Sequence, residues 1–165
     1  MRGSRPSAFG PVREKGGHEK TGRRFGIIRN VDVFVTLEAS VELDALRLLR
    51  PAPSAWGLLV GHRRGPRIFV ERIFPAAAGA ALPPHSGLDE LDRLFGRKVV
   101  GVFAVRPGAA LMKSLLGPYL YRRVLLDVRF SRDKIVLKPF LVEFDRAFYL
   151  APIALEAGPK GVAHE

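Results

Sequence analysis

Residues 99–105 read VVGVFAV, an uninterrupted apolar run that restricts the folds open to this chain. A strand with one face toward water alternates apolar and polar residues, whereas a strand covered on both faces is apolar throughout. The run is also far shorter than the roughly 20 residues that a membrane-spanning helix needs. We therefore expect a central strand at 99–105, in a sheet with packed elements on both faces.

The segment before this strand predicts one further strand and a helix. Apolar and polar residues alternate over 31–37, which indicates a half-buried strand. Ser40 offers an N-cap for a helix that Pro51 ends. The residues of this helix that we expect to be buried are Val41, Ala45, Leu46, Leu48 and Leu49.

Two pairs of apolar runs predict hairpins. Residues 55–62 and 67–74 flank the turn sequence RRGP, and residues 122–130 and 134–144 flank a polar turn. Pro139 falls inside the last of these strands and has no backbone N–H, so we expect a bulge or a sheet edge there. The chain from residue 146 onward gives no clear pattern.

Two more helices are expected between the strands. Ser86 with Asp89 resembles a capping box, and the helix that it opens ends at Gly96. A shorter helix of two turns covers 109–116. Together the elements predict an α/β (α+β) fold, with a mixed β-sheet flanked by helices.

Composition divides the chain into three parts. Residues 1–24 are rich in Gly and basic groups and lack apolar periodicity, so we expect a disordered basic arm. Residues 25–157 form the domain, and 158–165 a flexible tail. Neither a bilayer-spanning run nor the apolar segment of a secretory signal is present, so we expect a cytoplasmic protein without membrane contact.

Three stretches follow one another in this chain: SAWGLLVG at 54–61, IFP at 73–75 and VVGVFAVRP at 99–107, with Ser114 seven residues later. Together with the order of elements, they resemble the JAB/MPN domain family over residues 31–145. Active members of that family are JAMM metallopeptidases, which cleave isopeptide bonds to ubiquitin-like proteins. The family reads Glu-x-x-Gly-Leu-Leu-x-Gly at the first stretch and Val-Val-Gly-x-x-His-x-His-Pro at the third. The resemblance implies an MPN/cytidine-deaminase-like architecture.

The positions that hold the metal in active relatives lack ligand groups here. Ser54 stands at the Glu position, Ala104 and Arg106 at the two His positions, and Gly117 at the Asp position. Only Ser114 is kept, whose counterpart helps to stabilise the oxyanion. A catalytic zinc needs about three ligands from His, Cys or carboxylate, and a guanidinium repels a cation. We therefore expect no catalytic residue, no metal and no cofactor.

The resemblance then implies a catalytically inactive MPN-like domain that acts as a protein-binding or scaffold module. Its partner would be another MPN-domain protein or a ubiquitin-like protein. Ser114 is expected to be a plain polar or locally hydrogen-bonding residue. For Arg106, two readings stay open: a solvent-facing side chain at a strand end, or an anion-binding group in the vacated pocket. Trp56, the only Trp, is expected in the core, with a partner-anchoring role as the alternative.

The net charge of +11 supports a second hypothesis, a basic protein that binds nucleic acid without sequence preference. The candidate residues for contact with an anionic partner are cations at turns and strand ends: Arg63, Arg64, Arg67, Arg106, Arg122 and Arg123. The same runs can also be an ordinary solvated face. No aromatic-interleaved strand of a single-strand reader is present.

A third hypothesis is an active hydrolase with a displaced site. His62, Glu71, His85 and Asp89 could supply its groups, although their spacing gives no reason to expect convergence. The chain has no cysteine, which excludes disulfides and thiolate chemistry, and it has only four histidines.

Overall fold

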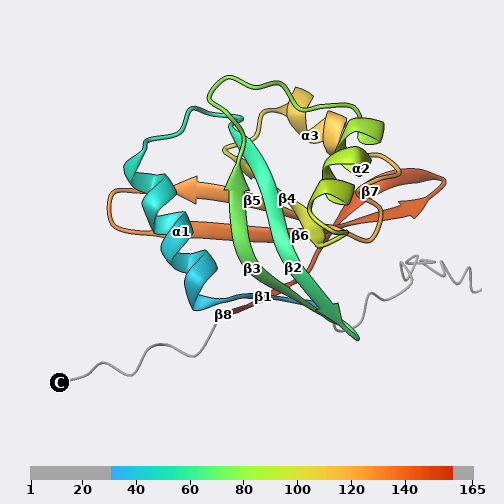
Figure 1. The fold of residues 1–165 in the computed structure, drawn as a ribbon, viewed down its shortest axis with the longest axis horizontal. Helices are drawn as coiled ribbons and strands as arrows, with labels where there is room; N and C mark the ends of the chain where they lie inside the picture. The colour runs from blue at the N-terminus through green and yellow to red at the C-terminus, as the bar shows by residue number, and fades with distance from the viewer. Residues whose placement is uncertain (1–30, 158–165) are drawn as a thin grey trace, which may run out of the picture.

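The computed structural model describes residues 31–157, which form one mixed sheet of eight strands with three helices (Figure 1). The predicted α+β class with a mixed sheet is confirmed. The basic arm predicted at 1–24, the first residues of the predicted domain and the tail at 158–165 lie outside the described residues.

The elements follow one another in an interleaved order, as predicted up to residue 145. They are β1 (Asp32–Val35), α1 (Leu37–Leu48), β2 (Trp56–Arg64), β3 (Arg67–Pro75), α2 (His85–Leu94), β4 (Val99–Val105), α3 (Ala109–Leu115), β5 (Val124–Phe130), β6 (Ile135–Asp145), β7 (Ala147–Pro152) and β8 (Ala154–Ala157).

The sheet places β4 near its middle, in the order β7-β6-β5-β4-β2-β3-β1-β8. β4 pairs antiparallel with β2 and parallel with β5. Six of its seven residues are buried, which confirms the prediction of a strand covered on both faces. The two predicted hairpins are also confirmed, as β2–β3 and β5–β6.

Two hydrophobic clusters cover the two faces of the sheet. On one face, α1 contributes Ala39, Leu43 and Leu46 to a cluster with the strands. On the other face, Leu88 of α2 and Leu115 of α3 belong to a second cluster. Figure 1 shows the same division, with α1 on one side of the β2–β3 hairpin and α2 and α3 together on the other. The end of β4 is thus reached by different helices from its two sides.

The last two strands bring the sheet close to closure. β7 pairs with β6 at one end of the sheet, while β8 pairs parallel with β1 at the other end. Only Ile153 separates β7 from β8, so the two edges are consecutive in the chain. The sheet therefore curves into a nearly closed form. The sequence from residue 146 onward gave no prediction for these two strands.

The prediction for the first helix was wrong about its start and its buried face. The N-cap is Thr36, whose hydroxyl accepts a hydrogen bond from the Ala39 N–H at 3.3 Å, and Ser40 lies inside the helix. α1 has apolar residues on more than one side. Because the helix begins earlier than predicted, a different row of apolar side chains faces the sheet. The residues that were wrongly predicted as buried are Val41, Ala45, Leu48 and Leu49, whereas Leu46 is buried.

The cap predicted for the second helix was also wrong. α2 begins at His85 with Pro84 as its N-cap, and no side chain caps it, so Ser86 lies within the first turn. The fixed φ of proline suits the entry to a helix, and the Pro84 carbonyl accepts from the Leu88 N–H. The predicted end is confirmed, since Gly96 has a φ of +64° just after the helix.

Pro139 lies where β6 loses its partner on one side. β7 pairs with β6 only between Phe140 and Asp145, so Pro139 is one residue outside that ladder. Its carbonyl accepts from the Ile153 N–H, the residue between β7 and β8. The proline thus occupies a local edge of β6, in agreement with the prediction. Within residues 31–157, no helix is long and apolar enough to cross a bilayer.

Candidate functional site

The loop before β2 and the end of β4 are tied together near two of the predicted site positions. The Gly108 N–H donates to Ser54 Oγ at 3.1 Å, and the Ser54 N–H donates to the Val105 carbonyl at 2.7 Å. Ala104 is fully buried in β4, opposite Trp56 of β2 and Asp127 of β5. Ser54 and the end of β4 are therefore neighbours.

His85 fills the space beside Gly117. A Cβ atom on Gly117 would lie 2.4 Å from Nε2 of His85, closer than any side chain allows. The same Nε2 lies 3.0 Å from the Ser114 carbonyl oxygen, a contact in which the imidazole N–H donates. Ser114 Oγ in turn donates to the Ala110 carbonyl within α3. A ring from the start of α2 therefore stands where a side chain at position 117 would project.

The Arg106 side chain points away from Ser54, Ser114 and Gly117. Its φ of +42° ends the strand alternation, and its guanidinium donates to the Phe130 carbonyl at 2.7 Å. The exposed side chain lines a cavity on the α1 side of β4, and that cavity has neither Ser54, Ser114 nor Gly117 in its wall. Arg106 is thus an exposed side chain at a strand end, and it does not enter a pocket shared with the other three.

The cavity that Arg106 lines has a volume of about 570 Å³ and holds four arginines. Arg47 and Arg50 come from the end of α1, Arg106 from the end of β4, and Arg132 from the β5–β6 turn. We call this the arginine cavity. Its remaining wall is mainly apolar: Leu48, Pro51, Pro53, Val105 and Phe130, together with Ser131.

Only one of these four cations has a carboxylate nearby among residues 31–157. Arg47 lies 3.7 Å from Asp44, an exposed residue one helical turn earlier. The Nε of Arg47 is buried and has no acceptor in the described part of the chain. Arg50 and Arg132 form neither an ion pair nor a side-chain hydrogen bond with another described residue, and Arg106 bonds only to a carbonyl. The cavity therefore carries a large uncompensated positive charge.

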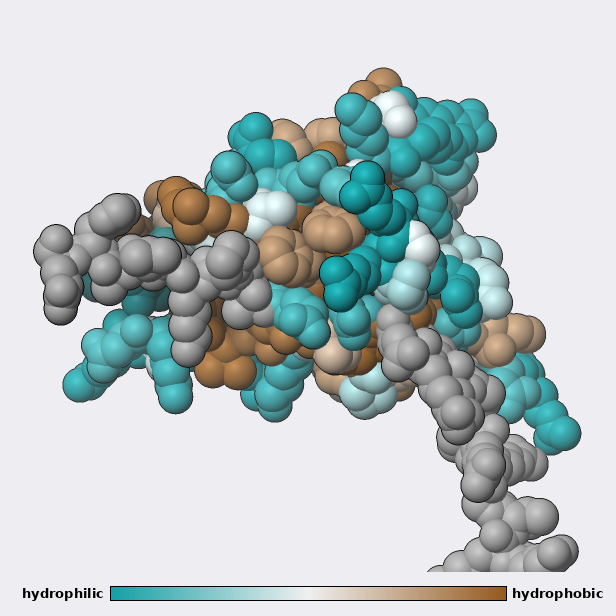
Figure 2. Space-filling model, turned by 90° about the horizontal axis from the view of Figure 1, so that it is seen from below, coloured by the Kyte–Doolittle hydropathy of each residue, from teal (hydrophilic) through white to brown (hydrophobic). Residues whose placement is uncertain are grey.

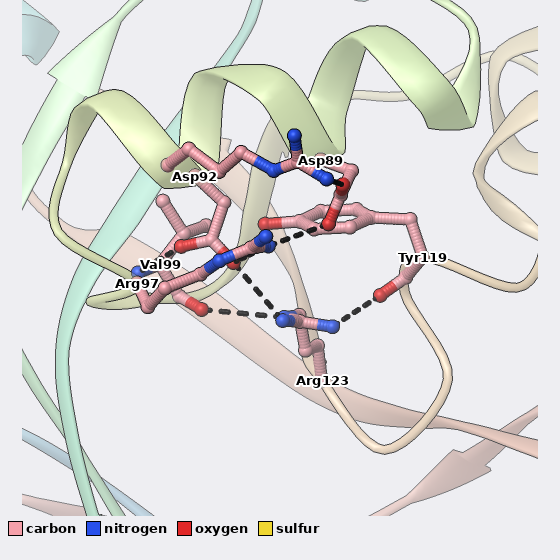
Figure 3. Close-up of polar contacts among 7 residues, drawn as sticks. Asp89, Asp92, Arg97, Val99, Tyr119 and Arg123 are labelled. Atoms are coloured by element: carbon pink, nitrogen blue, oxygen red, sulfur yellow. Dashed lines mark hydrogen bonds and ion pairs between the residues drawn. The ribbon is translucent and has the colours of Figure 1, made fainter.

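A second group of arginines, at α2 and the chain entering β5, is fully paired (Figure 3). Asp92 is completely buried, accepts from the Val99 N–H at 3.0 Å and lies 3.1 Å from Arg123 Nη2. The Arg123 guanidinium also stacks over the ring of Tyr119, 4.2 Å from its centroid. We call Asp89, Asp92, Arg93, Arg97, Tyr119 and Arg123 the Asp92 network.

The outer part of this network has shifted pKa values. A hydrogen bond from Arg97 lowers the pKa of the Asp89 carboxyl, and the charges of Arg93 and Arg123 lower it further. Burial raises the pKa of the Tyr119 hydroxyl, while the Arg123 charge acts in the opposite direction. Every ionised group of the network has an opposite charge close by, so its role is structural.

The remaining predicted cations divide between a cavity and the hairpin turn. Arg63, Arg122 and Arg123 line a cavity of about 340 Å³, together with Arg97 and Lys98. Arg122 is held by Glu143 at 3.1 Å, and Arg123 belongs to the Asp92 network. Arg64 and Arg67 are exposed at the β2–β3 turn and do not line this cavity.

The groups of the third hypothesis meet only in part. His62 Nδ1 lies 3.1 Å from Glu71 Oε1, and its ring stacks on Phe69. His85 contacts Ser114, and Asp89 is held by arginines. Between residues 31 and 157, no group of three or more His, Cys, Asp or Glu is placed to hold a metal ion.

Trp56 belongs to the core, as expected. Its side chain is buried in the cluster under α2 and α3, and its indole N–H donates to the Ala80 carbonyl at 2.9 Å. The partner-anchoring alternative needs an exposed ring and is therefore wrong.

The arginine cavity was missed by sequence reasoning except for Arg106. Arg47 and Arg50 lie three residues apart, Arg132 lies more than eighty residues later, and together they form no motif. Two of them stand in the last turn of a helix or just beyond it, where a cation is common because it complements the helix dipole. Only the fold brings the end of α1, the end of β4 and the β5–β6 turn together, and with them these arginines.

Comparison with known proteins identifies the fold and no more. The chain matches no protein-family model, and no curated protein matches it. It is similar to the solution structure of protein DSY2949 from Desulfitobacterium hafniense, a structural genomics target, with a TM-score of 0.53. Sequence identity is 21%, over 81% of this chain and 99% of that one. This similarity supports the α+β fold and assigns no activity.

Proposed function

We propose that this chain is a non-catalytic, MPN-like domain that binds a protein partner with an acidic surface. The observation that carries the proposal is that the chain keeps the three family-like stretches but has no metal-binding side chain at the positions of the family's ligands. Ala104 and Gly117 have no donor atom, His85 stands beside Gly117, and Arg106 turns to the Phe130 carbonyl.

Close packing between strands explains why the glycines of these stretches would be kept in a chain that binds no metal. A Cβ on Gly57 would lie 2.4 Å from the ring of Phe103, and one on Gly101 would lie 2.1 Å from the Val124 carbonyl oxygen. On Gly61 it would lie 1.8 Å from the Phe69 carbonyl oxygen. These glycines of the motif are needed by close strand contacts. The fold therefore constrains them even when the ligand positions change.

The outer face of α1 supports a protein partner. Leu37, Val41 and Leu48 lie at helical spacing and are 74%, 59% and 77% exposed, and Arg47 and Arg50 lie at the same end as Leu48. On the face in Figure 2, hydrophobic residues reach the surface in separate patches between hydrophilic ones. Apolar side chains beside cations suit a partner with a mixed apolar and acidic surface, such as a ubiquitin-like protein or another MPN-domain protein.

Restoring the ligands tests the resemblance itself. The variant would combine Ser54→Glu, Ala104→His, Arg106→His and Gly117→Asp, with His85→Ala to free the space beside position 117. We expect it to bind one zinc per chain, while the wild type binds none above background by elemental analysis. A folded variant without zinc would contradict the resemblance. Stoichiometric zinc with isopeptidase activity in the wild type would refute the non-catalytic assignment, and this result does not depend on how the variant folds.

The partner surface needs a separate experiment. Binding of purified acidic ubiquitin-like proteins to the full chain would be measured by fluorescence anisotropy, with Val41→Glu plus Leu48→Glu as the disrupting variant. We expect at least a tenfold loss of affinity in this variant. Lys138→Glu, a charge change on β6 away from α1, is the control. Equal loss in both variants, or no binding by the wild type, would contradict the proposed surface.

Non-specific nucleic-acid binding is the second candidate, and the observation in its favour is charge. The chain carries +11, and Arg64 and Arg67 are exposed at a turn without an ion pair among the described residues. Phosphate contacts of this type weaken steeply with salt. A gel shift with duplex DNA and single-stranded RNA at rising salt tests it, and the absence of a shift at low ionic strength rejects it.

A further inference from the structure

The arginine cavity has the chemistry of a binding site for a phosphate group. Four arginines from three separate parts of the chain line one cavity of about 570 Å³. A guanidinium stays charged at every physiological pH and binds phosphate oxygens with two parallel N–H groups. We propose that this cavity binds a small organic phosphate, either a monoester or a diphosphate. The inference goes beyond the proposed function and does not depend on the MPN resemblance.

The four arginines have too few carboxylates nearby, in the part of the chain that the structure describes, to balance their charge, which is the first indication of an anion site. Within residues 31–157, the four cations have one carboxylate at ion-pair distance, Asp44, and it lies 3.7 Å from Arg47 and is well exposed. Like charges that converge without counter-charge repel one another and raise the local concentration of anions. Arg47 also keeps a buried Nε without an acceptor among the described residues. An incoming anion of charge −2 or more would relieve this repulsion.

The helix dipole accounts for only part of the cluster. Arg47 and Arg50 stand at the C-terminal end of α1, where any cation is favoured by the last carbonyl groups. Arg106 and Arg132 belong to a strand end and a turn, and that explanation does not extend to them. Arg106 is moreover held in place by its hydrogen bond to the Phe130 carbonyl. The convergence therefore needs a reason beyond helix stability.

The apolar part of the wall indicates the rest of the ligand. Phe130, Pro51, Pro53 and the exposed Leu48 line the same cavity. Its volume lies within the range of roughly 300–1,000 Å³ that is typical of small-molecule sites. A cavity with cations and an apolar wall suits a phosphate on an organic group better than a bare ion. It also suits a compact ligand better than a nucleic-acid backbone, which contacts a charged stripe.

The other basic cavity serves as an internal comparison. It contains as many arginines, but Arg97 and Arg123 are paired with Asp92, and Arg122 with Glu143. Those guanidinium groups have already exchanged water for carboxylates. An anion would have to displace these contacts, so the unpaired cavity is the stronger anion site.

Isothermal titration of the full chain with phenyl phosphate, inorganic phosphate and pyrophosphate tests the proposal at constant ionic strength. The variants are Arg50→Gln and Arg132→Gln, which remove no side-chain hydrogen bond or ion pair to another described residue. Arg64→Gln is the matched control, with the same charge change outside the cavity. We expect each cavity variant to bind phenyl phosphate and pyrophosphate with an affinity at least fivefold lower than that of the wild type. The affinity of the control should stay within twofold of the wild type.

Four results would overturn the proposal. No heat of binding at millimolar phosphate compounds would remove the site. An equal loss of affinity in Arg64→Gln would show that the phosphate compounds are attracted by the net charge of the protein and do not bind in the cavity. Equal affinity for phenyl phosphate and inorganic phosphate would remove the organic part of the ligand. Tight binding of duplex DNA with no response to phenyl phosphate would favour nucleic acid and reject the small-molecule site. Zinc content and isopeptidase activity play no part in these outcomes, so the two proposals fail independently.

Discussion

The Asp92 network and the arginine cavity are built from the same side chain and lie on opposite sides of the sheet. In the network, Arg97 and Arg123 surround a fully buried carboxylate. In the cavity, Arg50, Arg106 and Arg132 have no carboxylate at ion-pair distance among residues 31–157. The difference teaches that an arginine count says little until its counter-charges are known. A paired guanidinium holds the fold together, and an unpaired one is free to bind a ligand.

The largest expected effect is on stability, from the centre of the network. Asp92→Ala would leave Arg123 without its partner and the Val99 N–H without its acceptor. We expect a loss of about 4 kcal/mol in the free energy of unfolding, measured by urea denaturation. Asp145→Ala, at an exposed carboxylate outside any ion pair in the described chain, is the control and should change stability by less than about 0.5 kcal/mol. Equal small changes in both variants would break the contrast between the two regions.

Removing the cation of the same pair should have the second largest effect. Arg123→Met keeps much of the aliphatic stem but leaves Asp92 buried with a weaker partner, and it also removes the cation over the Tyr119 ring. We expect a loss of about 2 kcal/mol, discounted because the guanidinium is partly exposed. The same substitution at Arg132 in the cavity is the comparison, and denaturation curves of the two variants should separate clearly.

A smaller effect is expected from acid, and its sign follows from Asp89. The pKa of this carboxyl is lowered in the folded protein, chiefly by the Arg97 hydrogen bond. A lowered folded-state pKa gives stability above the unfolded-state value, and this stability disappears as pH falls through the folded-state value. The melting temperatures of the wild type and Asp89→Asn should therefore differ at pH 7, and the difference should begin to shrink as the pH falls below about 4. A difference that stays constant down to pH 3 would contradict the ion pair.

The smallest expected change is in the cavity. Arg50→Ala and Arg132→Ala remove unpaired, exposed cations, so each should alter the free energy of unfolding by less than about 0.5 kcal/mol in either direction. A slight gain is allowed, because like charges in the cavity repel one another. Urea denaturation at low salt is the measurement. A loss above about 1.5 kcal/mol would show that these residues are structural after all.

Local patterns predicted the strands β1 to β6 and the short helix α3 well because strand burial and turn chemistry act over neighbouring residues. The continuous apolar run at 99–105 and the turns predicted at 63–66 and 131–133 are examples. The buried face of α1 was mispredicted because the helix is apolar on two sides, and the sheet that selects Ala39 and Leu43 is assembled from distant segments. β8 was missed for the same reason, since it pairs with β1, more than a hundred residues earlier in the chain.

The sequence resemblance named a set of motif positions, but it did not predict their geometry or the arginine cavity. The family resemblance implied the positions Ser54, Ala104, Arg106, Ser114 and Gly117, but the direction in which Arg106 points depends on a positive φ and a carbonyl on β5. The role of His85 beside Gly117 had no signal in the sequence, because α2 and α3 are brought together only by packing on the sheet.

The pairing of β8 with β1 has a consequence for synthesis. β1 lies between β3 and β8, and the second of these partners consists of residues 154–157. A ribosome that has released β1 through β6 holds a chain in which the outer edge of β1 still offers open backbone groups. The domain can complete its sheet only after its last strand leaves the exit tunnel, so chaperones or a neighbouring chain have a window in which to reach that edge first.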